Sequence, residues 1–181
     1  MLKNIPNKIT LLRIALIPVF LVLAYLELRW AALFVFIAAS LTDLLDGYLA
    51  RRYHQITNIG KFMDPLADKM LVLAAMCFFV EKGQMPGWAL AVVLLREFAV
   101  SGLRMIAVEK NRVIAAAWSG KVKTAATMVC LCLMLLFPAP GLGDSAPDFI
   151  AHISTAVIVL STVWSGVEYF IKNRDVFKGV D

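Results

Sequence analysis

The chain has few charged residues and little histidine or cysteine for its length. Of its 181 residues, 17% are charged and 61% hydrophobic, with 2 histidines and 3 cysteines. A soluble domain normally carries about 25% charged residues, so this composition excludes an ordinary soluble protein and predicts an integral membrane protein. Cys77, Cys130 and Cys132 fall inside apolar runs. We expect them to be buried thiols rather than disulfides or metal ligands.

The chain also lacks a repeat of fixed period, a low-complexity tract and a long linker, which predicts one domain over residues 1–181. Apolar stretches close to the roughly 20 residues that a membrane-spanning helix needs recur along it. They lie at about 10–29, 31–50, 66–81, 86–109, 115–137 and 148–171. We therefore predict an all-α, polytopic membrane protein with six transmembrane helices and a short amphipathic segment at the N-terminus.

Turn signals separate these stretches. Glu27-Leu28-Arg29 is expected to form the first loop, and Pro86-Gly87 to break the chain between the third and fourth spans. The longest polar stretch, Arg51 to Lys61, is predicted to be a loop that can hold the water-soluble part of a ligand. Pro65 directly follows Asp64, which predicts a helix that starts at the proline with the aspartate as its N-cap.

Lysine and arginine are unevenly distributed among the predicted connections. Only Arg29 and Lys82 fall on one side of the membrane, so the positive-inside rule places both termini and the 51–61 loop in the cytoplasm. Trp30 and Trp88 fall at the predicted outer boundaries, where aromatic anchors are common. The net charge of +5 suits membrane lipid, phosphate or nucleotide groups, and we do not expect a nucleic-acid partner.

Four aspartates flank the second connection: Asp43, Asp46, Asp64 and Asp68. A charge at the centre of a bilayer costs about 2.5 to 3.5 kcal/mol, so four carboxylates beside apolar runs need a compensating partner. The members of each pair are three or four residues apart and lie on one face of a helix. An all-oxygen set without histidine or cysteine favours Mg²⁺ or Mn²⁺ over zinc. Four carboxylates are enough for two ions.

These aspartates and their neighbours resemble the signature of the CDP-alcohol phosphotransferase family. The matching residues are Asp43, Asp46, Gly47, Ala50, Arg51, Gly60, Asp64 and Asp68. The resemblance implies a six-helix membrane fold, a homodimer, a cytoplasm-facing cavity and two divalent ions held by the four aspartates. It further implies that Asp68 is the general base, and that the CDP portion of CDP-diacylglycerol contacts four residues: Gly47, Ala50, Arg51 and Gly60.

The N-terminal segment Asn4 to Arg13 resembles the amphipathic opening of the same family. There, Asn7 and Thr10 would approach the nucleotide of CDP-diacylglycerol. A basic helix lying in the membrane interface explains the same residues equally well. Both interpretations stay open at the level of the sequence.

Two further segments, 96–104 and 118–124, resemble the bacterial phosphatidylglycerophosphate synthases, a branch of that family. The likeness implies glycerol 3-phosphate as acceptor and a place in the bacterial cytoplasmic (inner) membrane. The candidate acceptor-binding residues are Arg96, Arg104, Lys121 and Lys123. In an alternative, Arg96 pairs with a carboxylate and Arg104 extends to the membrane surface. On a regular helix the two lysines would point to opposite sides.

The predicted reaction transfers the phosphatidyl group of CDP-diacylglycerol to glycerol 3-phosphate and releases CMP. The same metal site would also serve serine, an inositol phosphate or phosphatidylglycerol as acceptor, and only the cationic residues favour glycerol 3-phosphate. A Mg²⁺ transporter is the hypothesis from another class, but all four aspartates cluster on one side of the membrane. Among the remaining polar residues, we expect Glu168 to pair with a neighbouring helix.

Overall fold

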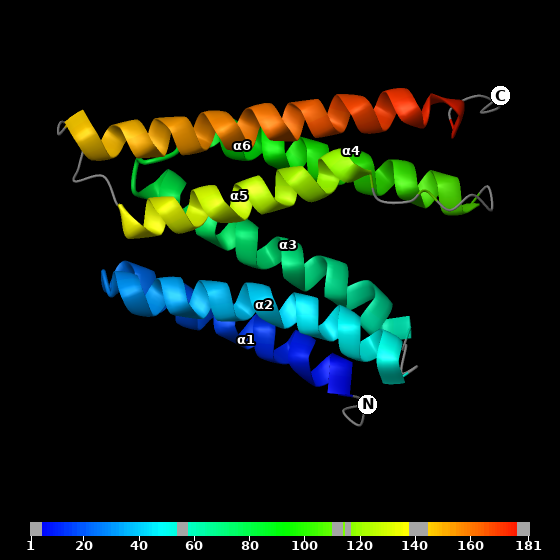
Figure 1. Ribbon diagram of the computed structural model, residues 1–181, viewed down its shortest axis with the longest axis horizontal. Helices are drawn as coiled ribbons and strands as arrows, with labels where there is room; N and C mark the ends of the chain where they lie inside the picture. The colour runs from blue at the N-terminus through cyan, green and yellow to red at the C-terminus, as the bar shows by residue number, and fades with distance from the viewer. Residues whose placement is uncertain (1–4, 54–57, 110–113, 115–116, 138–144, 177–181) are drawn as a thin grey trace. The chain divides into compact units, whose positions relative to one another are not determined.

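The computed structural model describes residues 5–53, 58–109, 114, 117–137 and 145–176, and side chains within 11–42, 69–108, 114, 117–137 and 149–175. In these residues the secondary structure is entirely helical, with no strand (Figure 1). The predicted all-α class is confirmed. The helices are α1 (Ile5–Tyr25), α2 (Arg29–Tyr53), α3 (Asn58–Glu81), α4 (Gly87–Glu109), α5 (Trp118–Leu136), α6 (Ser145–Lys172) and the short 3-10 helix η1 (Arg174–Val176).

Each of the six α-helices corresponds to one predicted apolar stretch. Two segments in the described part of the chain, Trp118–Leu136 and Phe149–Lys172, are long and apolar enough to cross a membrane. The apolar parts of the first two helices, Leu11–Tyr25 and Arg29–Thr42, are shorter. These helices agree with a membrane protein, whereas six crossings stay a prediction.

Several helix ends differ from the prediction. The 51–61 stretch is not one continuous loop, because α2 continues to Tyr53 and α3 begins at Asn58. Asp64 therefore lies inside α3 and is not its N-cap, so that prediction is wrong. Likewise, the predicted amphipathic segment is the first part of α1. Polarity marks where a helix leaves an apolar environment, but polar residues do not end a helix by themselves.

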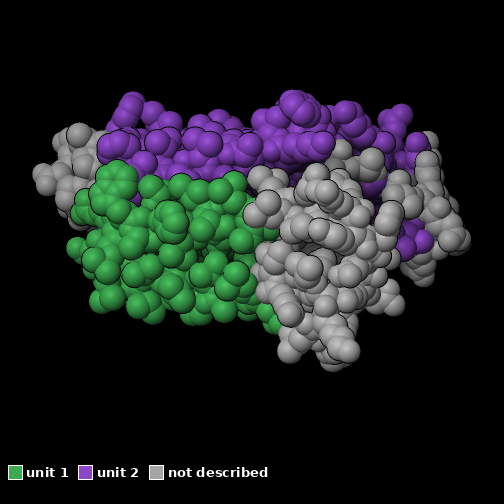
Figure 2. Space-filling view, turned by 60° about the horizontal axis from the view of Figure 1, so that its bottom comes forward, with its two compact units in different colours: residues 1–79 green, residues 80–181 purple. Residues whose placement is uncertain are grey.

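The chain divides into two compact units, residues 1–79 (unit 1) and 80–181 (unit 2), coloured separately in Figure 2. In unit 1, α1 packs along α2. The rings of Phe20 and Phe36 lie 5.5 Å apart between these two helices. The ring of Tyr25 meets that of Phe78 edge-on at 5.1 Å, which joins the end of α1 to α3.

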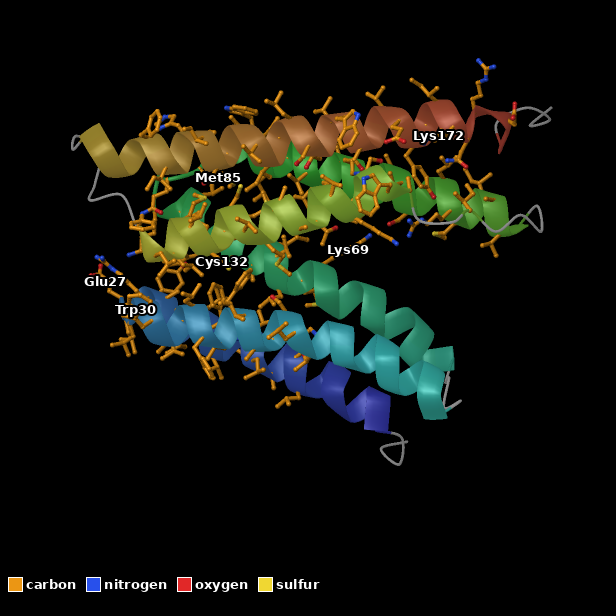
Figure 3. All side chains as sticks on the ribbon, viewed as in Figure 1. Glu27, Trp30, Lys69, Met85, Cys132 and Lys172 are labelled. Carbon is orange, nitrogen blue, oxygen red and sulfur yellow. The ribbon has the colours of Figure 1, made fainter. Side chains whose placement is uncertain are left out.

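The α1–α2 connection is a tight turn. Glu27 has a φ of 59°, which few residues other than glycine adopt, and α2 begins two residues later. The turn confirms the loop that was predicted around Glu27. Trp30 projects from the first turn of α2 and is 76% exposed, close to Glu27 in Figure 3. This exposure is consistent with the predicted interfacial anchor.

In unit 2, α6 packs against both α5 and α4. Its buried face repeats every three or four residues and consists largely of small or hydroxylated side chains: Ala151, Ser154, Thr155, Ile158, Thr162, Ser165 and Tyr169. Small residues on one helix face allow helix backbones to approach closely, as is common in membrane proteins. As predicted, the α3–α4 connection breaks at Pro86-Gly87, and Gly83 within it has a φ of 72°.

Candidate functional site

The four candidate metal ligands lie on two consecutive helices of unit 1. Asp43 and Asp46 are on α2, and Asp64 and Asp68 are on α3. By the helical rise of 1.5 Å per residue, Asp46 is about 10 Å from the end of α2 and Asp64 about 9 Å from the start of α3. Both pairs therefore lie at similar distances from the connection that joins the helices. The aspartate side chains lie outside the described part of the chain.

Four of the six candidate CDP-diacylglycerol residues share these helices, and the other two lie on α1. Asn7 and Thr10 are in the first turns of α1. The others lie between Asp46 and Asp64 in the sequence. Gly47, Ala50 and Arg51 are on α2, and Gly60 is on α3. Gly47 and Ala50 are three residues apart in the helix, so they share a face of α2. The side chains of Asn7, Thr10, Ala50 and Arg51 lie outside the described part of the chain.

Immediately before this segment, a buried arginine joins α1 to α2. Arg13 is 1% exposed, and its Nε donates a hydrogen bond of 3.2 Å to Oγ1 of Thr42. The Thr42 hydroxyl in turn donates to the carbonyl oxygen of Ala39 at 2.6 Å. Thr42 directly precedes Asp43, so this hydrogen bond links α1 to the turn of α2 that contains the first aspartate. The sequence predicted a basic start to α1 but not this contact.

The candidate acceptor-binding residues belong to unit 2, where a carboxylate joins two of them. Glu97 of α4 accepts hydrogen bonds from two cations on the same oxygen, Oε1. Nζ of Lys123 on α5 is 2.7 Å away, and Nη1 of the adjacent Arg96 is 2.9 Å away. The side chains are only 9% exposed for the lysine, 13% for the glutamate and 14% for Arg96. We call Arg96, Glu97, Lys123 and Ser165 the Glu97 cluster.

Arg96 also forms a hydrogen bond with the neighbouring helix α6. Its Nη2 donates to Oγ of Ser165 on α6 at 2.6 Å. Glycines surround the rest of the side chain: a Cβ on Gly166 would lie 3.2 Å from Cγ of the arginine, and one on Gly120 of α5 would lie 3.8 Å from Nη2. In the described part of the chain, the buried Nε of Arg96 has no hydrogen-bond partner. The guanidinium is therefore positioned by its surroundings and still has donors to offer.

Arg104 lies two turns further along α4 and is exposed. Its Nε donates to the hydroxyl of Tyr169 at 3.0 Å, and its guanidinium carbon lies 5.5 Å from the centroid of the same ring. The tyrosine is 2% exposed and packs with Val100, Leu103 and Ala107 of α4. A rigid aromatic side chain thus supports this arginine, although the guanidinium remains accessible.

The two candidate lysines face different surroundings. The segment that contains them is helical, because α5 begins at Trp118. As expected for residues two apart on a helix, Lys123 is buried in the Glu97 cluster whereas Lys121 is exposed. The alternative in which Arg96 pairs with a carboxylate is also observed, since Glu97 is that carboxylate. Such a pair leaves other guanidinium protons for an anion.

Glu168 forms an ion pair with Lys172, four residues later on α6. Its carboxylate also interacts with Ser119 on the neighbouring helix α5, as the sequence predicted. Lys172 is 63% exposed and lies near the end of α6 (Figure 3). An acidic residue four positions before a lysine is a common pair on one helix, and it satisfies the carboxylate locally. Ser165 and Tyr169, which contact the two candidate arginines, were not identified from the sequence.

Comparison with known proteins points to one family. The family model for CDP-alcohol phosphatidyltransferases matches residues 3–165. The chain is 43% identical over 190 residues to a Bacillus subtilis (strain 168) protein named CDP-diacylglycerol–glycerol-3-phosphate 3-phosphatidyltransferase, with 97% of each chain covered. Proteins of the same name from Escherichia coli (strain K12) and Sodalis glossinidius are 39% and 36% identical. These alignments cover 94% and 97% of this chain, and 95% and 98% of the relatives.

Proposed function

Because this chain belongs to the CDP-alcohol phosphatidyltransferase family, we propose that it transfers the phosphatidyl group of CDP-diacylglycerol to glycerol 3-phosphate. The products are phosphatidylglycerophosphate and CMP. The observation that carries this proposal is similarity over nearly the whole chain to relatives named for that reaction. The Glu97 cluster supports the choice of acceptor, because it holds two cations next to each other, one buried and one mostly buried.

Asp43, Asp46, Asp64 and Asp68 are the proposed ligands of two divalent ions, Mg²⁺ or Mn²⁺. The donor set fits such ions, since four carboxylates on two consecutive helices provide hard oxygen ligands at similar distances from one connection. When bound, the ions would neutralise the diphosphate of CDP-diacylglycerol and the charge that develops on departing CMP. Arg51, on the same helix as the first pair, offers a planar fork for diphosphate oxygens.

A second set of proposed roles concerns the binding of CDP-diacylglycerol. Gly47, Ala50 and Gly60 would let the CDP portion approach the helix backbones closely. Asn7 and Thr10 of α1 would contact the nucleotide. The acyl chains of the lipid would remain among the membrane lipids.

In the proposed reaction, the primary hydroxyl of glycerol 3-phosphate attacks the β-phosphorus of CDP-diacylglycerol. A new phosphorus–oxygen bond forms, and the bond from that phosphorus to the bridging oxygen breaks, so that the oxygen leaves with CMP. Asp68 would accept the hydroxyl proton. Arg96, Arg104, Lys121 and Lys123 would bind the acceptor phosphate and orient the hydroxyl, which turns a bimolecular encounter into an oriented one.

We further propose that the enzyme works as a homodimer in the bacterial cytoplasmic membrane, with six spans and with its termini and site facing the cytoplasm. The distribution of lysine and arginine along the chain supports this orientation. The bacterial origin of the three relatives supports the location.

The test is CMP release by the purified, detergent-solubilised protein from CDP-diacylglycerol. Release should require Mg²⁺ or Mn²⁺, stop with a chelator and occur with glycerol 3-phosphate. Serine, inositol phosphate and phosphatidylglycerol serve as competing acceptors. Release with another acceptor alone would refute the assigned substrate, and no release with any acceptor from folded protein would refute the transferase and favour ion transport.

Matched variants test the metal ligands. Asp43→Asn and Asp64→Asn each remove one negative charge while keeping the side-chain shape, and each should abolish turnover because the ions lose a ligand. Full activity of either variant at saturating Mg²⁺ would contradict the four-aspartate assignment.

A further inference from the structure

Glu97 has no role in the proposed chemistry, yet it is the centre of the buried polar cluster in unit 2. Its Oε1 is the shared acceptor for Lys123 of α5, at 2.7 Å, and for Arg96 of α4, at 2.9 Å. Two cations that converge on one oxygen repel each other, and the repulsion is strong where water is scarce. The carboxylate offsets this repulsion and fixes the spacing of the two cationic groups.

The hydrogen bonds to Glu97 fix the orientation of the two cationic side chains as well as compensating their charge. Arg96 uses Nη1 for Glu97 and Nη2 for Ser165, so its planar guanidinium is anchored at two of its three nitrogens. Lys123 has three donors, and among the described residues the structure gives it one partner, Glu97. The remaining donors of both cations belong to side chains that can hardly rotate. Such a pair is preorganised for an anion.

We propose that Glu97 is a positioning residue for acceptor binding: through its single bridging oxygen it holds Arg96 and Lys123 as a rigid pair that binds the phosphate of glycerol 3-phosphate. Glu97 itself does not touch the acceptor, since a carboxylate and a phosphate repel. This inference rests on the proposed function. It goes beyond it by assigning acceptor affinity to a residue of the same charge as the acceptor.

The alternative is a purely structural ion pair that ties α4 to α5. Breaking a structural pair would lower thermal stability without a selective effect on either substrate. Breaking a positioning pair would weaken acceptor binding and leave CDP-diacylglycerol binding unchanged. The ratio of the two KM values therefore separates these roles.

The experiment measures CMP release by the detergent-solubilised full chain while the two substrates are varied separately. Glu97→Gln keeps the shape but removes the charge, so the KM for glycerol 3-phosphate should rise about 10- to 100-fold, the range expected when a supporting residue is removed and a reactant is displaced. The KM for CDP-diacylglycerol should change less than about twofold, because its proposed contacts lie on other helices.

Glu168→Gln is the matched control. This variant makes the same change of glutamate to glutamine in a different ion pair of unit 2, the pair of Glu168 with the exposed Lys172 on α6. Both KM values should stay at the wild-type level in this variant. An equal rise in the glycerol 3-phosphate KM in the control would overturn the proposal, because the effect would then reflect general loss of negative charge.

Glu97→Asp keeps the test decisive if the glutamine variant does not fold. It preserves the charge and hence an ion pair, but it withdraws the oxygen by one methylene and should still raise the glycerol 3-phosphate KM about tenfold. A wild-type KM in either folded variant overturns the positioning role. Wild-type protein that releases no CMP with glycerol 3-phosphate would instead refute the proposed function itself.

Discussion

Gly166→Ala should weaken acceptor binding without unfolding the protein. Gly166 is buried on α6, and an added Cβ would lie 3.2 Å from Cγ of Arg96. That contact is shorter than an ordinary van der Waals separation, so the arginine stem must move by a few tenths of an ångström. The guanidinium cannot follow freely, because Ser165 and Glu97 hold its two terminal nitrogens at 2.6 Å and 2.9 Å.

The magnitude follows from two opposing effects. Alanine in a helix interior is more stable than glycine by about 0.5 to 1 kcal/mol. A hydrogen bond to a charged group contributes about 1.5 to 3 kcal/mol, and a displaced arginine would weaken one such bond rather than lose it. The free energy of unfolding should therefore change by less than about 1 kcal/mol. The glycerol 3-phosphate KM should rise about three- to tenfold, since about 1.4 kcal/mol corresponds to a factor of ten.

The assay combines thermal unfolding in detergent with separate KM values for the two substrates. Gly102→Ala is the matched control, because Gly102 lies on α4 with Arg96 and an added Cβ there meets no atom of the described residues within 4 Å. It gains the same helix propensity but does not touch the arginine. A glycerol 3-phosphate KM at the wild-type value in the Gly166 variant, with unchanged stability, would refute the reasoning that the position of Arg96 determines acceptor affinity.

The remaining predictions concern the neighbouring contacts. Lys123→Gln should raise the glycerol 3-phosphate KM at least about tenfold, and more than Lys121→Gln does. The reason is that, of the two lysines, Lys123 is the one held in the Glu97 cluster. Equal effects of the two variants in steady-state kinetics would contradict this prediction. Tyr169→Phe keeps the ring but removes the hydroxyl that accepts a hydrogen bond from Arg104, so the glycerol 3-phosphate KM should rise about threefold. An unchanged KM would show that Arg104 does not need this hydrogen bond. Thr42→Val removes the acceptor of the buried Arg13 Nε and should lower the free energy of unfolding by about 1 to 3 kcal/mol, measured in detergent. A wild-type melting temperature would disprove that contribution.

The sequence predicts the helices better than it predicts their ends. Each apolar run corresponds to a helix, and Pro86-Gly87 marks a real break, because hydrophobicity and backbone geometry are local properties. The 51–61 stretch was misjudged because it is polar, although α2 and α3 both extend into it. The prediction that a helix starts at Pro65 was also wrong. Proline is often the first residue of a helix, but here it follows seven helical residues.

Pairings among the candidate site residues could not be predicted from the sequence in the same way. The spacing of the aspartates is visible in the sequence because each pair lies within one helix turn. The contacts of Arg96 with Ser165 and of Arg104 with Tyr169 join residues 69 and 65 positions apart. They depend on which face of α6 packs against α4, and this is a property of tertiary packing that the local sequence around the arginines does not contain.

The charges of the proposed acceptor residues would account for selectivity between charged and uncharged acceptors, but not for selectivity by size. Arg96 and Lys123 bring two positive charges, Glu97 removes one, and exposed Arg104 adds one on the same helix as Arg96. Without the exposed Lys121, these side chains sum to about +2, which would match a phosphate dianion. Serine, which has no net charge, would leave these cations uncompensated, so electrostatics disfavour it. An inositol phosphate carries the same phosphate group, so on the proposed function it would have to be rejected by the size of its ring and not by charge.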